Sequence, residues 1–219
     1  MSDLPQMSPA TRIVDAVQDA LRDAIFGGSL RAGEALSVPE LARRLNVSRS
    51  PVREAVLGLV AQGLAVEQPR RGVVVATIAE DDLVAIHEVR EFLEAGAARL
   101  AAARIDKAGV ERLRAILAAQ KRAVKDKDAA GYFRTNAELH RAIAEAAGNA
   151  RLVQILHTLE NQMRIALRRA AGNESHIRAG HDEHRRVVEA IAAGDEAAAE
   201  RAMRQHIANT IGRLRAEGA

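Results

Sequence analysis

The stretch NVSRSPVREAVLGLVAQGLAVEQPRRGVVV, residues 46–75, decides the fold of the first part of this 219-residue chain. Its first half places Val52, Val56 and Leu59 on one face of a helix. Gly63 ends that pattern, and two short apolar runs follow, separated by the turn sequence Pro-Arg-Arg-Gly. We therefore expect a helix and then a hairpin, with arginines at the start of the helix and at the hairpin tip.

Two further helices are expected before this one. Apolar residues at helical spacing predict the first, entered at Ser8-Pro9, where serine caps and proline fits the first turn. The segment Ser37-Val-Pro-Glu40 fits a capping box that opens the second helix, and Asn46-Val47-Ser48 fits a tight turn into the third. Three helices and a hairpin with strands near 64–68 and 73–77 predict a winged helix-turn-helix over residues 8–77.

Positive charge gathers in this domain. Residues 43–72 hold six arginines and two acids, a local net charge of +4 that suits phosphates. Arg49 and Arg53 lie one turn apart at the amino end of the third helix, where they can enter a major groove. Arg70 and Arg71 occupy the hairpin tip. Double-stranded DNA is the expected partner; a helical subdomain with an incidental basic edge is the alternative.

These residues resemble a known family. The stretch Leu41–Val75, with its motifs SRSPVREA and PRRG, is similar to the amino-terminal domain of the GntR family of bacterial transcription regulators. The resemblance implies DNA contacts from Ser48, Arg49, Ser50, Arg53 and Gly72. A two-fold dimer would then read a palindromic operator.

The remaining two thirds of the chain contain no strand pattern. A second Thr-x-x-Glu sequence, Thr77–Glu80, marks the expected domain boundary. The fold expected for residues 78–217 is an all-α six-helix bundle, so the whole chain is expected to be mostly α. The six helices are expected at 79–104, 107–126, 128–147, 150–171, 179–193 and 195–217.

Composition excludes several classes of protein. Hydrophobic residues make up 48% of the chain and aromatics 2%, so the core is expected to be aliphatic. Cysteine is absent, which excludes disulfides and thiolate chemistry. The start of the sequence lacks a signal-peptide pattern, and no apolar run approaches the roughly 20 residues of a membrane span. We expect a cytoplasmic protein with no membrane contact.

Three of the seven histidines adjoin apolar stripes in the second domain: His140, His184 and His206. They can converge inside the bundle. Imidazoles gathered in an aliphatic core indicate a divalent metal of the zinc, nickel or manganese class. The alternative is that each is an ordinary core or surface histidine.

Residues 80–217 resemble the FCD effector domain of the FadR branch of the GntR family, and six helices indicate the VanR-like subgroup. The match lies in VREFLEAGAARLAA, NAELHRAIAEAAGN, DEHRRVVEAIAAGD and AMRQHI. It implies a metal held by His140, His184 and His206, and it places Asn136 where relatives carry an aspartate. It also implies that Arg90 binds an effector; Arg164 is a second candidate for that role.

The predicted function is a homodimeric, ligand-responsive transcription regulator, a repressor rather than an enzyme, that senses a small carboxylate beside the metal. Since three imidazoles and the Asn136 amide are neutral, no protein ligand is expected to offset the charge of the ion, and the effector would do so. The alternatives are an acyl-CoA sensor, an architectural DNA binder without effector, and a helical metalloenzyme. No motif supplies the general base that an enzyme would need.

Overall fold

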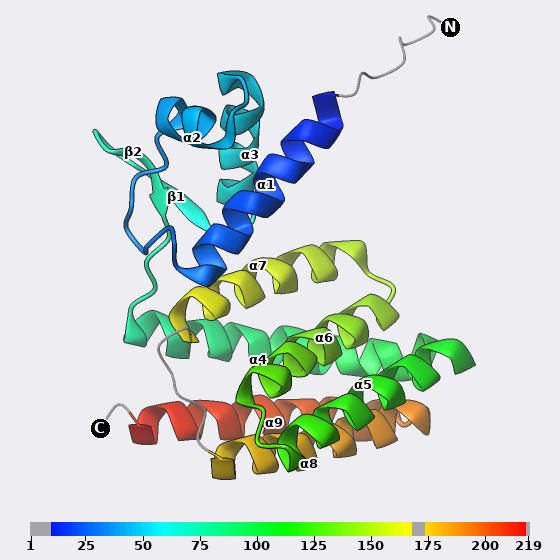
Figure 1. The fold of residues 1–219 in the computed structure, drawn as a ribbon. Helices are drawn as coiled ribbons and strands as arrows, with labels where there is room; N and C mark the ends of the chain where they lie inside the picture. The colour runs from blue at the N-terminus through cyan, green and yellow to red at the C-terminus, as the bar shows by residue number, and fades with distance from the viewer. Residues whose placement is uncertain (1–9, 168–173, 218–219) are drawn as a thin grey trace, which may run out of the picture. The chain divides into compact units, whose positions relative to one another are not determined.

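The computed structural model of the chain describes residues 10–167 and 174–217 (Figure 1). Its elements divide into two compact units, Met1–Ile78 with Asn161–Arg168, and Ala79–Glu160 with Arg169–Ala219. Each unit buries an aliphatic core of its own.

The first unit is the expected winged helix-turn-helix. Leu21, Val52 and Leu59 lie at the centre of its core, each at most 2% exposed. The two strands pair antiparallel, with Ala65 opposite Val75. The elements are α1 (Ala10–Gly27), α2 (Val38–Leu45), α3 (Arg49–Ala61), β1 (Ala65–Gln68) and β2 (Gly72–Val75). The expected helix entry at Ser8-Pro9 lies outside the described residues.

The start of α2 differs in detail from the expectation. Ser37 is its N-cap residue, but the serine side chain makes no capping hydrogen bond, so the predicted capping box is wrong. Burial of Leu41 and Ala42 against the core holds this short helix instead. The turn into α3 is as expected, because Asn46 adopts a left-handed conformation with φ 53°.

The second unit is an all-helical bundle, as predicted. Five of its helices form a closed ring in which α4, α9, α8, α5 and α6 are neighbours in that order (Figure 1). All five contribute to one core, and α7 contributes Leu156 to a smaller cluster with Ala97, Ala144 and Ala147. The helices are α4 (Glu80–Arg104), α5 (Lys107–Lys125), α6 (Ala129–Ala146), α7 (Ala150–Leu167), α8 (Glu174–Ala192) and α9 (Glu196–Glu217). The last part of α7, from Asn161 onward, belongs to the first unit.

One helix start and one helix cap were predicted wrongly. Helix α8 begins at Glu174 rather than 179 and continues through Gly180, because Ile177 packs in the interior and tertiary packing outweighs the low helix propensity of glycine. Helix α4 begins after Ala79, whose N–H donates to the Asp82 carboxylate at 3.3 Å, so the threonine of the Thr-x-x-Glu sequence is not its cap. The predicted end of α7 at 171 lies outside the described residues.

None of the described helices is long and apolar enough to cross a membrane.

Candidate DNA-binding surface and effector site

The first turn of α3 is exposed, whereas one face of the helix further along, formed by Val52, Ala55, Val56 and Leu59, is buried. Ser48 precedes the helix in extended conformation, with φ −69° and ψ 164°, and its side chain makes no capping hydrogen bond. Arg49 and Arg53 are both exposed, and no ion pair or hydrogen bond joins either side chain to another described residue. Ser50 lies 3.4 Å from the Glu54 carboxylate. The helix thus presents two guanidinium groups and two hydroxyls to solvent.

The hairpin tip carries two further exposed arginines. Arg70 has a φ of 65° and Gly72 a φ of 71°, so the chain reverses through two left-handed residues. Arg71 folds back, donating to the Gln68 side chain at 3.1 Å and to the Gly33 carbonyl at 3.2 Å. The two arginines therefore differ: Arg71 braces the tip against a neighbouring loop, while Arg70 extends from the turn.

The second unit brings His140, His184 and His206 together from α6, α8 and α9. One ring nitrogen from each lies within 4.8 Å of the others. The Nε2 atoms of His184 and His206 are 3.2 Å apart. All three rings lie in the interior of the bundle, and buried imidazoles that converge in this way are a typical ligand set for a divalent metal.

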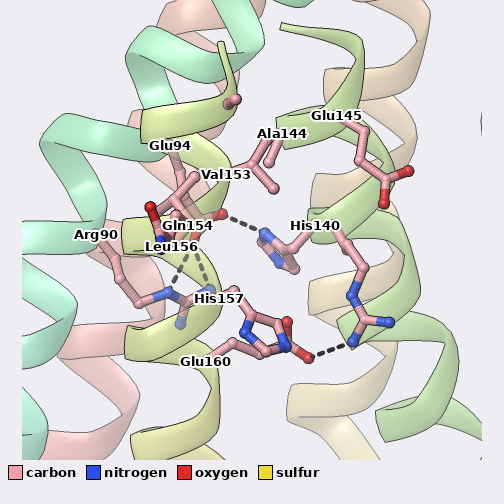
Figure 2. Close-up of a pocket in the computed structure, with 12 residues that line it drawn as sticks. Arg90, Glu94, His140, Ala144, Glu145, Val153, Gln154, Leu156, His157 and Glu160 are labelled. Carbon is pink, nitrogen blue, oxygen red and sulfur yellow. Dashed lines mark hydrogen bonds and ion pairs between the residues drawn. The ribbon is translucent and has the colours of Figure 1, made fainter. Parts of the chain in front are cut away.

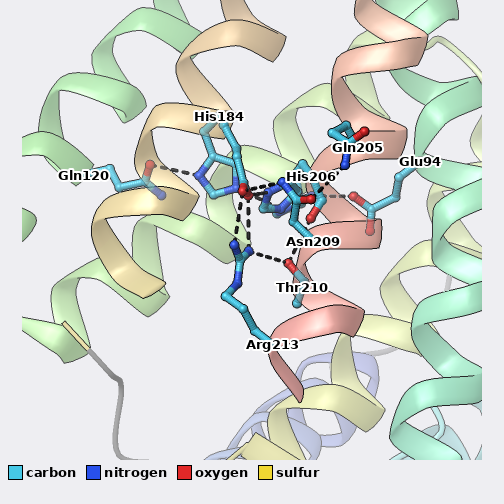
Figure 3. A network of polar contacts seen from close by, with 10 residues as sticks. Glu94, Gln120, His184, Gln205, His206, Asn209, Thr210 and Arg213 are labelled. Atoms are coloured by element: carbon cyan, nitrogen blue, oxygen red, sulfur yellow. Dashed lines mark hydrogen bonds and ion pairs between the residues drawn. The ribbon is translucent and has the colours of Figure 1, made fainter. Parts of the chain in front are cut away.

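Each imidazole is oriented by an acceptor on another helix (Figure 3). Nδ1 of His206 donates to Glu183 at 2.7 Å, and Nδ1 of His184 donates to the Gln120 amide oxygen at 3.0 Å. Nδ1 of His140 contacts the Glu94 carboxylate. With Nδ1 committed in every ring, Nε2 is the nitrogen available to an ion.

Two of these acceptors are themselves held in place. Glu183 also accepts hydrogen bonds from Asn209 at 2.7 Å and from both terminal nitrogens of Arg213, at 3.1 and 3.2 Å. The Gln120 oxygen also accepts from His181 Nδ1 at 3.1 Å, and Gln120 Nε2 is a buried atom without a hydrogen-bond partner among the described residues. A fixed outer layer of this kind holds imidazoles in one tautomer.

Burial keeps the His184 and His206 rings neutral. It lowers the pKa of His184 well below 6.5, with further lowering from the neighbouring His206 and His140. Burial likewise lowers the pKa of His206 to about 4, although Glu183 opposes the shift. For Glu183, burial alone would raise the pKa, but hydrogen bonds from His206 and Arg213 lower it to about 2. The site therefore combines neutral imidazoles with an ionised carboxylate, the protonation states that metal binding requires.

The two carboxylates correct one expectation. No protein ligand was expected to offset the charge of an ion; Glu94 and Glu183 are not among the predicted ligands, but each contacts one of the cluster histidines and places negative charge beside the site. Neither was found from sequence, because each comes from a helix distant along the chain from its partner histidine. Asn136 lies one turn before His140 on α6 and is half-buried, with no hydrogen bond to another described residue.

A cavity of about 410 Å³ lies between α4, α6 and α7 (Figure 2). Arg90 and His140 line it, whereas His184 and His206 do not. Both of its arginines are already paired: Arg90 with Glu94 at 2.5 Å, and Arg141 with Glu160 at 3.1 Å. The rest of the wall is mixed, with Ala144, Val153 and Leu156 beside Gln154 and His157.

Arg164, the second predicted effector residue, does not line this cavity. Its guanidinium carbon lies 3.7 Å from the centroid of the Phe26 ring, a cation–π arrangement.

Comparison with known proteins identifies both units. Residues 13–75 match the family of bacterial regulatory proteins named gntR, and residues 85–209 match the FCD domain. A probable D-xylose utilization operon transcriptional repressor of Paenarthrobacter nicotinovorans is 32% identical over 90% of this chain and 87% of its own length. The chain belongs to the GntR family. This GntR regulator is also 30% identical to LutR of Bacillus subtilis, over 84% of this chain and 93% of LutR.

Solved structures agree on the fold. McbR/YncC of E. coli superposes with a TM-score of 0.78 at 22% identity, over 98% of this chain and all of that one. A GntR regulator from Rhodococcus superposes with a TM-score of 0.73 at 23% identity, over 92% and 96% of the two chains. The protein is thus a DNA-binding transcription regulator with an FCD effector domain, as the sequence predicted.

Proposed function

We propose that this GntR regulator binds a divalent ion at His140, His184 and His206 and senses a small organic acid in the adjoining cavity. The ion would be held by the three Nε2 atoms and by the Asn136 amide oxygen. Once bound, it would act as a Lewis acid toward an anionic ligand. Glu94, Gln120 and Glu183 would keep the three rings in the ion-binding tautomer.

One observation carries the metal proposal. His184 and His206 each direct Nδ1 toward an acceptor, so their neutral rings carry lone pairs on the two Nε2 atoms that face each other at 3.2 Å. Two facing lone pairs in a dry interior repel and need a cation or a proton between them. Burial disfavours the proton, as the lowered pKa values of both rings indicate. A divalent ion fits this donor set.

The cavity supports a small effector rather than an acyl-CoA. Its volume of about 410 Å³ lies near the lower end for small-molecule sites. Charged groups on several walls also suit a polar ligand better than an acyl chain. Arg90 is the proposed partner of the effector carboxylate. It lines the cavity, and its neighbour Glu94 also contacts His140.

The DNA-bound form is proposed to be a homodimer that reads a palindrome through Arg49 and Arg53. An exposed apolar stripe on α4 supports contact between two copies: Val89 is 49% exposed and Phe92 is 68% exposed. Both fall on one helical face with Ala85, which is also exposed.

Elemental analysis of purified protein tests the metal site. One divalent ion per chain is expected in the wild type, and loss of it in His184→Ala and in His206→Ala. His176→Ala is the control, since this histidine lies outside the cluster. The same ion content in all four proteins would refute the site. A thermal-shift screen of small acids with and without zinc then tests the effector class.

A further inference from the structure

A single buried carboxylate connects the cavity to the histidine cluster. One oxygen of Glu94 accepts from Arg90 Nε at 2.6 Å and from a terminal Arg90 nitrogen at 2.5 Å. Its other oxygen contacts Nδ1 of His140 (Figure 2). The three side chains are between 5% and 8% exposed, so water screens these interactions weakly.

The lining of the cavity gives this carboxylate a special position. Of the described residues that line the cavity, His140 is the one that belongs to the histidine cluster. Glu94 also lines the cavity, and its carboxylate contacts both His140 and Arg90. His184 and His206 do not line the cavity; they come from α8 and α9, and each has a ring nitrogen within 4.8 Å of one on His140. A ligand in the cavity can therefore contact Arg90, Glu94 and His140, and it adjoins the ion site through His140.

The charge of Glu94 is shared between two partners. Burial by itself would raise the pKa of this carboxyl, but Arg90 and His140 lower it well below its usual range, so the group stays ionised. A guanidinium that holds a carboxylate through two nitrogens takes up much of its charge. The rest of the negative charge of Glu94 acts on the His140 ring and, through that ring, on an ion bound to it.

We propose that Glu94 couples the cavity to the ion and that Arg90 opposes ion binding by taking up the negative charge of Glu94. A carboxylate ligand that binds Arg90 frees the Glu94 carboxylate to interact with His140, and this tightens ion binding. This inference rests on the proposed function, since it takes the ion and an acidic effector as its two ligands. Glu94 is a positioning residue that acts through His140. Coupling between two binding sites is reciprocal, so the ion would favour the acidic effector by the same factor.

Zinc affinity in single and double variants tests the coupling without an identified effector. Arg90→Met removes the guanidinium at similar length and imitates a ligand that has engaged it. In the ion-free variant the negative charge of the buried Glu94 carboxylate is no longer offset by Arg90, and a bound ion offsets that charge instead. Zinc titrated against a fluorescent chelator should bind about five-fold tighter or more. Glu94→Gln should bind zinc at least roughly ten-fold more weakly.

The double variant distinguishes coupling through Glu94 from simple repulsion between Arg90 and the ion. If Arg90 acts through Glu94, Arg90→Met should change zinc affinity by less than about two-fold in the Glu94→Gln background. If Arg90 only repels the ion, the full tightening should persist there. Persistence of the effect would overturn the proposal.

Two controls address structural damage. Arg141→Met removes the other arginine of the cavity, which pairs with Glu160 and has no contact with the histidine cluster, and should leave zinc affinity unchanged. The melting temperature measured with and without zinc is informative even for a destabilised variant. Without zinc, Arg90→Met should melt at a lower temperature than the wild type, but zinc should raise its melting temperature by more. A smaller gain than in the wild type would contradict the coupling.

The outcomes separate this inference from the proposed function. Zinc binding that requires His184 but ignores Arg90 would overturn the coupling and leave the metal site intact. A wild-type protein that binds no zinc, nickel or manganese would overturn both.

Discussion

A β-carbon on Gly180 would overlap the hydroxyl oxygen of Tyr132, so α8 carries a glycine in its interior to admit the tyrosine of α6. Tyr132 is 6% exposed, and burial raises its pKa to about 12. After the hydroxyl, the next atom within reach of that β-carbon is the ring carbon Cζ, at 3.5 Å, an ordinary contact distance. The hydroxyl alone therefore prevents a side chain at position 180.

Gly180→Ala should destabilise the protein by about 1–3 kcal/mol, the typical cost of overpacking a core. In the Tyr132→Phe background the same substitution should become stabilising by up to about 1 kcal/mol, because alanine has the higher helix propensity. Urea unfolding of the four proteins measures both effects. Destabilisation of equal size in both backgrounds would show that the hydroxyl is not the obstacle.

Acid should destabilise the metal-free protein through its buried histidines. Burial lowers the pKa of both His87 and His206 to about 4, against 6.5 for an ordinary histidine. The unfolded chain therefore takes up protons first as the pH falls. The contribution of these two neutral histidines to the free energy of unfolding is complete above pH 6.5 and is lost as the pH falls from 6.5 toward 4. By pH 5 each histidine lowers the free energy of unfolding by about 2 kcal/mol relative to neutral pH.

Urea unfolding in the presence of a chelator at pH 7, 6 and 5 measures this loss. His206→Gln should show a shallower dependence on pH, whatever its absolute stability. A free energy of unfolding that is constant from pH 7 to pH 5 would refute the assignment.

Arg49→Ala and Arg53→Ala should each abolish most sequence-specific DNA binding. A bidentate base contact contributes roughly 1–3 kcal/mol, and a dimer makes each contact twice. Binding to a duplex selected by the wild type, compared with a scrambled duplex, measures the loss. Arg201→Ala is the matched control, because this arginine is exposed on α9 in the second unit. Unchanged affinity of Arg49→Ala for the selected duplex would remove α3 as the reading element.

The hairpin tip should contribute to affinity rather than specificity. Arg70→Gly keeps the left-handed turn but removes a charge, so selected and scrambled duplexes should both bind more weakly, with the salt dependence reduced by about one phosphate contact per chain, or about two per dimer. Arg71→Ala should also loosen the tip, since Arg71 braces it against Gly33. Titrations at two salt concentrations measure the slopes. Loss confined to the selected duplex would instead indicate base contacts by the hairpin.

Asn136→Asp should strengthen zinc binding in the absence of an effector, because a carboxylate offsets the charge of the ion and an amide does not. The gain should be smaller than in a site without carboxylates, since Glu94 and Glu183 already contact the cluster. Chelator competition on both proteins measures it, with Asn149→Asp as the control, because Asn149 is exposed and its side chain caps the start of α7, where an aspartate fits equally well. Equal zinc affinity in Asn136→Asp and the wild type would place residue 136 outside the ion's coordination.

Local patterns in the sequence were sufficient for the elements of the first unit and for the exposed arginines of α3 and the hairpin. The helical spacing of Val52, Val56 and Leu59, the glycine at 63 and the Pro-Arg-Arg-Gly turn all act within a few residues, so they predict α3 and the hairpin directly. The three cluster histidines were also predictable, because each adjoins an apolar stripe that must face the core. The start of α8 at Glu174 was missed, since packing between helices decided it.

Residue types and spacing predict which groups the effector domain holds: three imidazoles in an aliphatic core and many charged residues with no evident pairing. Which of these groups meet depends on how the helices pack. Glu94 reaches His140 from α4, and Glu183 reaches His206 from α8, because the closed ring of helices places these faces together. A helix repeats every 3.6 residues and predicts which side chains share its own face, but not which side chains on another helix lie opposite them.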